Sequence, residues 1–146
     1  MIDIVYDLIK SRRTEFANTW GDGLFVVFKT VKEGADFALA LLERVQEHEW
    51  ENLGADLTPG IRIALHTGPA YRCYDSIASG NNYFGRHVNL AARIEPATEV
   101  NCVYTSEQFA AILALEADHN YYCEYVGLTT LPKDSGELPL YHLMRR

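Results

Sequence analysis

The sequence predicts an α+β fold close to a ferredoxin-like sandwich. Helical and strand patterns alternate along the chain, and glycine-rich turns join several strands as hairpins, which makes the sheet mixed or antiparallel. The chain has 146 residues, of which 48% are hydrophobic and 23% charged, values typical of a globular domain with a proper core. Because there is no repeat, low-complexity tract or linker, residues 1–146 are expected to form one domain.

The first third of the chain is predicted to form a helix, a hairpin and a second helix. Apolar residues recur at helical intervals over the first dozen positions, as in an amphipathic helix. Residues 15–20 and 24–28 flank Gly21-Asp22-Gly23, and glycine and aspartate are typical of a tight hairpin turn. An apolar stripe over residues 31–45 predicts a helix that runs to about His48.

The rest of the chain is expected to alternate in the same way. The elements follow in this order: a strand at 61–66, a loop or irregular hairpin at 71–82, a helix at 83–94 that Pro96 stops, a strand at 100–104, a helix through Leu115, and closing strands at 121–128 and 138–143 around a turn at 132–136. Thr105 and Gln108 have the spacing of a capping box for the last helix.

Charge and composition exclude several classes of partner. A net charge of −7 opposes a broad nucleic-acid surface, although single cations such as Arg86 and Arg93 can hold one nucleotide. No apolar run approaches the ~20 residues that span a bilayer, and no secretory signal pattern opens the chain. Three cysteines without pair spacing indicate reduced thiols. We therefore expect a cytoplasmic protein, or a piece of a longer one, without a membrane segment.

The segment from Tyr83 to Glu95, YFGRHVNLAARIE, carries the main candidate site. Asn89 and Arg93 lie four residues apart and share one face of the predicted helix. An amide beside a planar guanidinium suits a ribose oxygen and a phosphate whose charge is being redistributed. The alternative is an ordinary solvated helix face.

Three further side chains are candidates. Asp22 lies at a hairpin tip, where flanking glycines let a ligand approach and Mg²⁺ would suit the carboxylate, but aspartate is also a common turn residue. Lys133, in the late turn, is a candidate triphosphate-binding residue or an exposed turn lysine. His66 ends a strand, where it could meet a ligand, but we expect its ring to be satisfied by the backbone at the sheet edge.

Three motifs in a fixed order resemble the catalytic domain of class III nucleotide cyclases, the adenylate and guanylate cyclase family. They are Asn18-Thr-Trp-Gly-Asp-Gly, Arg62-Ile-Ala-Leu-His-Thr-Gly and Tyr83-Phe-Gly-x-x-Val-Asn-Leu-Ala-x-Arg-Ile-Glu. The pattern Tyr125-Val-Gly leading to Gly136-Glu-Leu-Pro-Leu-Tyr141 is also similar to that family. The resemblance covers the chain from about Thr14 to its C-terminus.

The resemblance implies a reaction and a composite site. The ribose 3′-oxygen of a nucleoside triphosphate attacks the α-phosphate and releases pyrophosphate, with two divalent ions, Mg²⁺ or Mn²⁺, as cofactors. By motif, Asp22 corresponds to one of two metal-binding aspartates, Asn89 to the residue that orients the ribose, and Arg93 to the one that stabilises transition-state charge. Family members form head-to-tail dimers in which each site combines both subunits, so we expect a homodimer.

The chain departs from the family pattern at its start. The other metal aspartate of the family lies on an opening strand with a Phe-x-Asp-Ile-x-Gly-Phe-like motif, well upstream of the hairpin. Met1-Ile2-Asp3-Ile4-Val5 mimics part of that motif, but Asp3 is too close to Asp22 and the Gly-Phe is absent. The first strand of the sandwich is therefore expected to be missing. A fragment of a longer protein, a degenerate domain and a substitute segment are the three explanations, and we favour the fragment.

The positions that contact the base do not identify it. Asn18 stands where adenylate cyclases usually carry lysine and guanylate cyclases glutamate, and Asn82 stands where the family carries aspartate, cysteine or a related small residue. Amides both donate and accept, so ATP, GTP, CTP and UTP all remain open. We expect a cyclase domain that forms a 3′,5′-cyclic nucleotide for intracellular signalling and is impaired in this chain. The alternatives are a non-catalytic regulatory or nucleotide-binding module and a purely structural domain.

Overall fold

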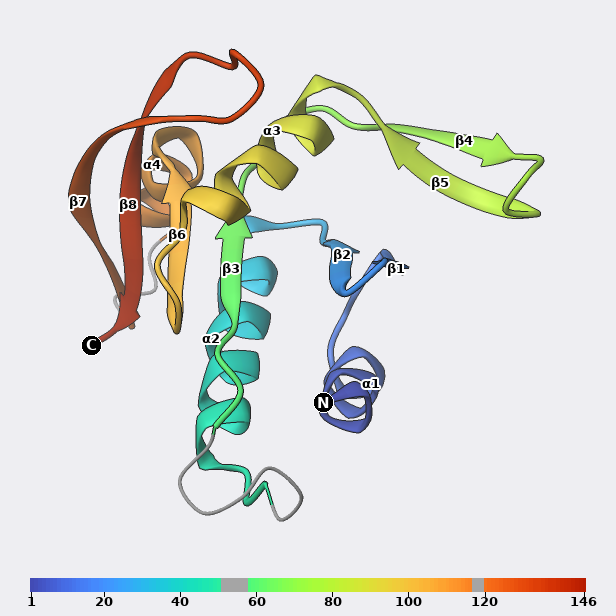
Figure 1. Ribbon diagram of the computed structural model, residues 1–146, viewed down its shortest axis with the longest axis horizontal. Helices are drawn as coiled ribbons and strands as arrows, with labels where there is room; N and C mark the ends of the chain where they lie inside the picture. The colour runs from blue at the N-terminus through green and yellow to red at the C-terminus, as the bar shows by residue number, and fades with distance from the viewer. Residues whose placement is uncertain (51–57, 117–119) are drawn as a thin grey trace.

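The computed structural model describes residues 1–50, 58–116 and 120–146 and has the predicted α+β class (Figure 1). The elements are α1 (Ile2–Ser11), β1 (Phe16–Trp20), β2 (Gly23–Val27), α2 (Val31–Glu47), β3 (Arg62–Leu65), β4 (Tyr71–Asp75), β5 (Gly80–Phe84), α3 (Arg86–Ile94), a 3₁₀ turn (Glu95–Ala97), β6 (Cys102–Ser106), α4 (Glu107–Leu115), β7 (Tyr121–Thr130) and β8 (Glu137–Arg145). None of the helices described is long and apolar enough to span a membrane.

A four-stranded mixed sheet, in the order β3-β6-β8-β7, forms the centre of the domain. β3 and β6 are parallel, whereas β8 is antiparallel to both β6 and β7. Successive side chains point to opposite faces of a strand, so Val103 packs under α2 and α4 while Tyr104 packs under α3. The sheet therefore separates two apolar clusters, with α2 and α4 on one face and α3 on the other.

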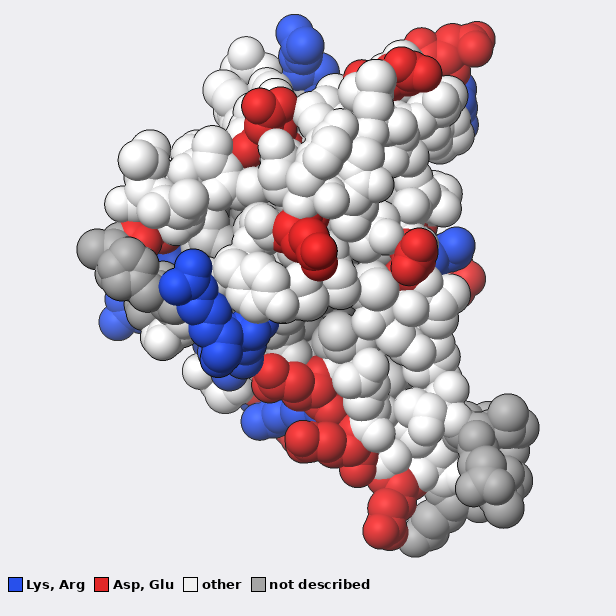
Figure 2. All heavy atoms as spheres, turned by 90° about the vertical axis from the view of Figure 1, so that its left-hand side faces the viewer, with Lys and Arg blue, Asp and Glu red and all other residues white. Residues whose placement is uncertain are grey.

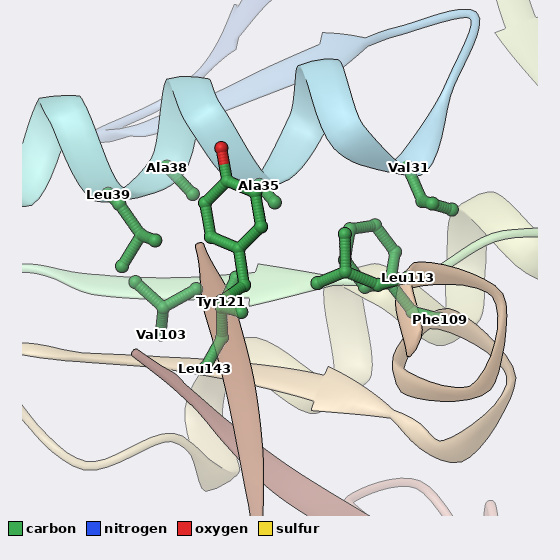
Figure 3. Packing of buried hydrophobic residues seen from close by; sticks show 9 residues of the cluster. All are labelled: Val31, Ala35, Ala38, Leu39, Val103, Phe109, Leu113, Tyr121 and Leu143. Carbon is green, nitrogen blue, oxygen red and sulfur yellow. The ribbon is translucent and has the colours of Figure 1, made fainter. Parts of the chain in front are cut away.

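The larger cluster joins α2 and α4 to the sheet (Figure 3). Ala35, Ala38 and Leu39 face the sheet from α2, and the Tyr121 ring extends from β7 toward the two small alanines. The Tyr121 hydroxyl points toward α2 and donates a hydrogen bond to Asp36, so its polar end is satisfied where the ring is buried. This contact ties the start of β7 to α2.

The open strand edges agree with the predicted gap in the sandwich. Among the described strands, β2 pairs only with β1 and β3 pairs only with β6, so one edge of each has no partner. Val26 of β2 and Ile63 of β3 nevertheless pack against the same buried cluster around Leu8 of α1. The unpaired N–H and C=O groups of these two edges can form hydrogen bonds with a further strand placed between them.

Asp3 lies in a helix and not on an opening strand. It sits in the first turn of α1, whose Leu8 is fully buried against α2. An acidic side chain in that turn is favoured by the helix dipole. The position agrees with leaving Asp3 out of the metal site.

Two predicted element boundaries were wrong. The helix expected at 83–94 begins only at Arg86, because Tyr83 and Phe84 pair with β4 as part of β5 and Gly85 has φ 136. The strand expected at 100–104 is displaced to Cys102–Ser106, since Asn101 takes a left-handed φ of 63 that breaks the extended chain.

The predicted cap of α4 was also wrong. Ser106, not Thr105, is the N-cap, and its hydroxyl accepts a hydrogen bond from the Phe109 N–H. Thr105 is still inside the sheet, where it pairs with Leu65 and Tyr141 and is fully buried. Strand β6 therefore includes Thr105, the residue that the capping pattern had assigned to the start of the helix.

The face that looks to the left in Figure 1 carries mixed charge (Figure 2). Basic and acidic groups lie next to each other there, and broad uncharged areas separate them. One ion pair of opposite charges joins Arg145 of β8 to Glu43 of α2 at 2.7 Å. This face presents no continuous basic surface of the kind that binds nucleic acid.

Candidate active-site face

Helix α3 presents Asn89 and Arg93 on one side, one turn apart. Asn89 is exposed and Arg93 half-buried, whereas Leu90 and the fully buried Ile94 pack into the cluster over β6 and β8. No hydrogen bond or ion pair within the described residues engages either the amide of Asn89 or the guanidinium of Arg93. The two polar groups are thus held by a packed helix and remain available to a ligand.

The C-terminal end of α3 is fixed to the sheet by two contacts. Glu95, directly after the helix, forms an ion pair with Arg62 of β3 at 3.0 Å. Leu131, only 2% exposed, packs in the same cluster as Ile94. Because Leu131 begins the turn between β7 and β8, that turn is held beside α3 (Figure 1). The helix therefore has a defined place relative to both closing strands.

Lys133 lies in this same turn. It is exposed and has φ 58. The Leu131 N–H donates to the Gly136 carbonyl, and the Ser135 hydroxyl donates to the carbonyls of Pro132 and Lys133. The turn backbone is thereby ordered, while the ammonium has no described partner and can move.

Asp22 lies at the exposed tip of the β1–β2 hairpin, as predicted. Its neighbour Gly21 has φ 62, which glycine adopts without strain, and Trp20 pairs with Gly23 to close the turn. The carboxylate has no intramolecular partner among the residues that the structure describes. Nor does the described chain contain a cluster of three or more His, Cys, Asp or Glu side chains that could hold a metal by themselves.

The two candidate base-contacting amides both fold back on their own strands. The Asn18 side-chain oxygen accepts from the Thr19 N–H and that of Asn82 from the Tyr83 N–H, each at 2.8 Å. A contact between the rings of Phe16 and Tyr83, with centroids 5.6 Å apart, brings β1 and β5 together. One ring contact therefore links the strands that carry the two amides, and each amide keeps an NH₂ group without a described partner.

The structure brings some of the candidates together and leaves others apart. Asn89 and Arg93 share one helix face, and the Lys133 turn lies against the same helix. No described hydrogen bond or ion pair links Asp22 to any of these three residues. The carboxylate and the α3 residues are therefore two separate parts of a candidate site.

The environment predicted for His66 was wrong. Its ring bonds to side chains and not to the backbone, with Nδ1 2.7 Å from Ser106 Oγ and Nε2 2.8 Å from Nδ1 of His87. Burial, followed by the proximity of His87, lowers the pKa of His66 to about 4. The sequence showed a histidine at a strand end and another in the first turn of α3, but their contact required the tertiary fold.

The lowered pKa predicts that acid destabilises the fold through His66. An unfolded histidine titrates near pH 6.5, so between pH 6.5 and 4 the unfolded chain binds a proton that the folded one does not. The contribution of neutral His66 to the free energy of unfolding is complete above pH 6.5 and is lost as the pH falls toward 4. Since the ring is only half-buried, solvent screens the effect and we expect about 1 kcal/mol.

Thermal unfolding between pH 7.5 and 4.5 tests this prediction. The wild-type Tm should fall more steeply than that of His66→Asn, which cannot titrate in this range. Both proteins contain the same carboxylates, so the difference between the two slopes isolates the histidine. Equal slopes would contradict the prediction.

A comparison of the sequence with protein families decides the relationship. The sequence model of the adenylate and guanylate cyclase catalytic domain matches residues 1–145. The chain belongs to this cyclase family. No curated protein matches its sequence.

Solved structures confirm the cyclase fold. An adenylate cyclase of Trypanosoma brucei in its monomeric state superposes with a TM-score of 0.79 at 20% identity, covering 97% of this domain and 76% of that chain. The adenylyl cyclase CyaB of P. aeruginosa gives 0.77 at 17%, with 98% and 78% covered. The guanylate cyclase domain of RhGC from Catenaria anguillulae, solved with GTP, gives 0.76 at 19%, with 97% and 78% covered. Both adenylate and guanylate cyclases thus share the fold of this cyclase-family domain.

Proposed function

We propose that this domain converts a nucleoside triphosphate into a 3′,5′-cyclic nucleotide and pyrophosphate, as part of intracellular signalling. The ribose 3′-oxygen forms a bond to the α-phosphorus, and the bond from that phosphorus to the pyrophosphate oxygen breaks. The observation that carries the proposal is the pair on α3, the exposed Asn89 and the half-buried Arg93, one turn apart and without described protein partners. Membership of the cyclase family supports it.

Each side chain of the pair has a distinct task in this proposal. The Asn89 amide can donate to and accept from a ribose oxygen, which orients the attacking group. The Arg93 guanidinium presents a fork of N–H donors to phosphate oxygens, where negative charge increases in the transition state. Lys133, on a turn held beside α3, supplies a mobile positive charge for the triphosphate.

The donor set fits Mg²⁺ or Mn²⁺ only in part. Asp22 is an exposed, unpaired carboxylate on a sharp turn, and such ions are commonly held by one or two carboxylates together with substrate phosphates. When bound, the ions would supply Lewis acidity at the phosphate and at the ribose hydroxyl. We propose that the second carboxylate comes from a strand that pairs with the open edges of β2 and β3.

We propose that the active form is a head-to-tail homodimer. The β4–β5 hairpin projects from the body of the domain (Figure 1), and Tyr74 and Ile77 on it are 67% and 96% exposed. Large apolar side chains at the end of a projecting arm favour contact with another protein surface. A partner bound in this way would bring its Asp22 to the α3 pair, which Asp22 of the same chain does not contact in the described structure.

The direct test is product formation by the full-length natural protein. Each of ATP, GTP, CTP and UTP is supplied with Mn²⁺, and cyclic nucleotide and pyrophosphate are measured separately. We expect equal amounts of both products from the preferred triphosphate. If none of the four yields a cyclic product, the proposed activity is wrong.

A second candidate function is nucleotide binding without turnover. The presence of one candidate metal carboxylate, Asp22, without a described metal cluster favours it. Such a module would show a higher Tm with a triphosphate but no product, because a ligand that binds only the folded state stabilises it. A purely structural domain would show neither response.

A further inference from the structure

Three polar side chains, linked by hydrogen bonds, connect β3, β6 and α3. His66 follows the last residue of β3, Ser106 ends β6 and caps α4, and His87 lies in the first turn of α3. The contacts run from Ser106 Oγ to His66 Nδ1 at 2.7 Å and from His66 Nε2 to His87 Nδ1 at 2.8 Å. Ser106 is only 1% exposed, so one end of the chain is anchored in the core.

The His87 ring is confined by packing as well as by its hydrogen bond. It meets the ring of His66 edge to edge, with centroids 5.1 Å apart and an angle of 27° between the planes. The ring also lies close to Gly68, where an added Cβ would be 2.4 Å from ring atoms Cγ and Nδ1. Any residue larger than glycine at position 68 would therefore displace the ring.

Only some protonation states allow this chain of contacts. With both rings neutral, one imidazole N–H lies between His66 and His87, and the Ser106 hydroxyl can serve as donor or acceptor to complete the chain. With both rings charged, two N–H groups would face each other across 2.8 Å. The arrangement thus excludes the state in which both facing nitrogens, His66 Nε2 and His87 Nδ1, carry a proton.

The start of α3 lacks a capping side chain, although Val88 in its first turn is buried. Its N-cap is Gly85, which has φ 136 and provides no side-chain cap. The first hydrogen bond of the helix runs from the Asn89 N–H to the Gly85 carbonyl at 3.2 Å. A helix start without a capping side chain frays more easily than a capped one. His87 lies between these two residues and, in addition to the buried Val88, holds this turn through a side-chain hydrogen bond to His66 directly after β3.

We propose that His66 and His87 are positioning residues, which hold the first turn of α3 against β3 and so set the direction of Asn89 and Arg93. The relevance to catalysis rests on the proposed function, because it assumes that these two side chains act on the nucleotide. The positioning itself is a property of the protein without a ligand. It can therefore be tested separately.

Amide hydrogen exchange followed by NMR measures the positioning directly. In His87→Ala, we expect the Asn89 amide to exchange about five- to tenfold faster than in the wild type, the loss typical of one partly buried hydrogen bond. The Val103 amide, in the buried strand β6, reports whether the whole domain opens. Its exchange rate should increase less than that of the Asn89 amide. His87→Asn retains a polar group near the Nδ1 position and should restore slow exchange at Asn89.

Two further variants separate this contact from a general effect of removing histidine. Gly68→Ala leaves both histidines in place but pushes the His87 ring aside, and should accelerate Asn89 exchange as His87→Ala does. His48→Ala removes a ring that packs on Trp50 beyond the far end of α2 and should leave Asn89 exchange unchanged. Wild-type exchange at Asn89 in both His87→Ala and Gly68→Ala would overturn the proposal.

Kinetics of the full-length protein distinguish this proposal from the proposed function. If the wild type is a cyclase, His87→Ala should lower kcat about tenfold or more with a small change in KM, because a displaced catalytic pair loses transition-state contacts before ground-state binding. His87→Asn should recover most of kcat. An inactive wild type whose α3 still loosens in His87→Ala would refute the cyclase activity and retain the positioning role.

Discussion

Replacing Arg93 with alanine is expected to lower kcat of the full-length protein by about 10²-fold or more, with the fold retained. The substitution removes the guanidinium that the proposal places at the phosphates, and a preorganised donor at developing charge is typically worth 10² to 10³ in rate. The fold should survive because Leu90 and Ile94, not Arg93, anchor the helix. Turnover and far-UV circular dichroism measure the two parts of the prediction.

Two matched variants sharpen the Arg93 experiment. Arg93→Lys keeps the charge but loses the planar fork, so it should recover only part of the rate. Arg44→Ala removes an exposed arginine from the last turn of α2 and should leave kcat unchanged. Unaltered turnover in Arg93→Ala would remove this residue from the mechanism, and loss of helical signal would show that its role is structural.

Local patterns predicted most of the elements because local physics controls them. The Gly21-Asp22-Gly23 turn was placed correctly, since its glycines permit a tight hairpin wherever strand residues flank them. The apolar stripe of α2 likewise ended where predicted, since one face of that helix packs against both α1 and the sheet. Errors arose where two signals overlapped, as at Tyr83 and Phe84, which are compatible with both a strand and the helix that follows.

The candidate site was predictable only where a single element carries it. Asn89 and Arg93 could be paired from their spacing because a helix puts residues four apart on one face. The contact of His66 with His87 and Ser106 depends on how β3, α3 and β6 meet, and no local pattern encodes that meeting. The same holds for Thr105, whose polar side chain suggested a cap although pairing on both sides buries it in the sheet.

Replacing Asp22 with alanine is expected to abolish turnover by the full-length protein and to leave its Tm nearly unchanged. The side chain is exposed at a hairpin tip and has no described intramolecular contact, so its removal costs the fold little. Its proposed metal ions would otherwise stabilise the transition-state charge by several kcal/mol. Asp22→Asn tests the same point with an uncharged side chain of equal size, and normal turnover by either variant would contradict the metal role.

Mixing the two inactive variants tests whether each site combines two subunits. In a head-to-tail dimer of one Asp22→Ala and one Arg93→Ala chain, one site carries both defects and the other retains the wild-type Asp22 and the wild-type Arg93. With random exchange of subunits, half of the dimers are mixed, so activity should return to about a quarter of the wild-type value. If Asp22 and Arg93 of the same chain formed the site, every site in the mixture would carry one defect and no activity would return. The mixture therefore distinguishes a composite site from one within a single chain by the presence or absence of turnover.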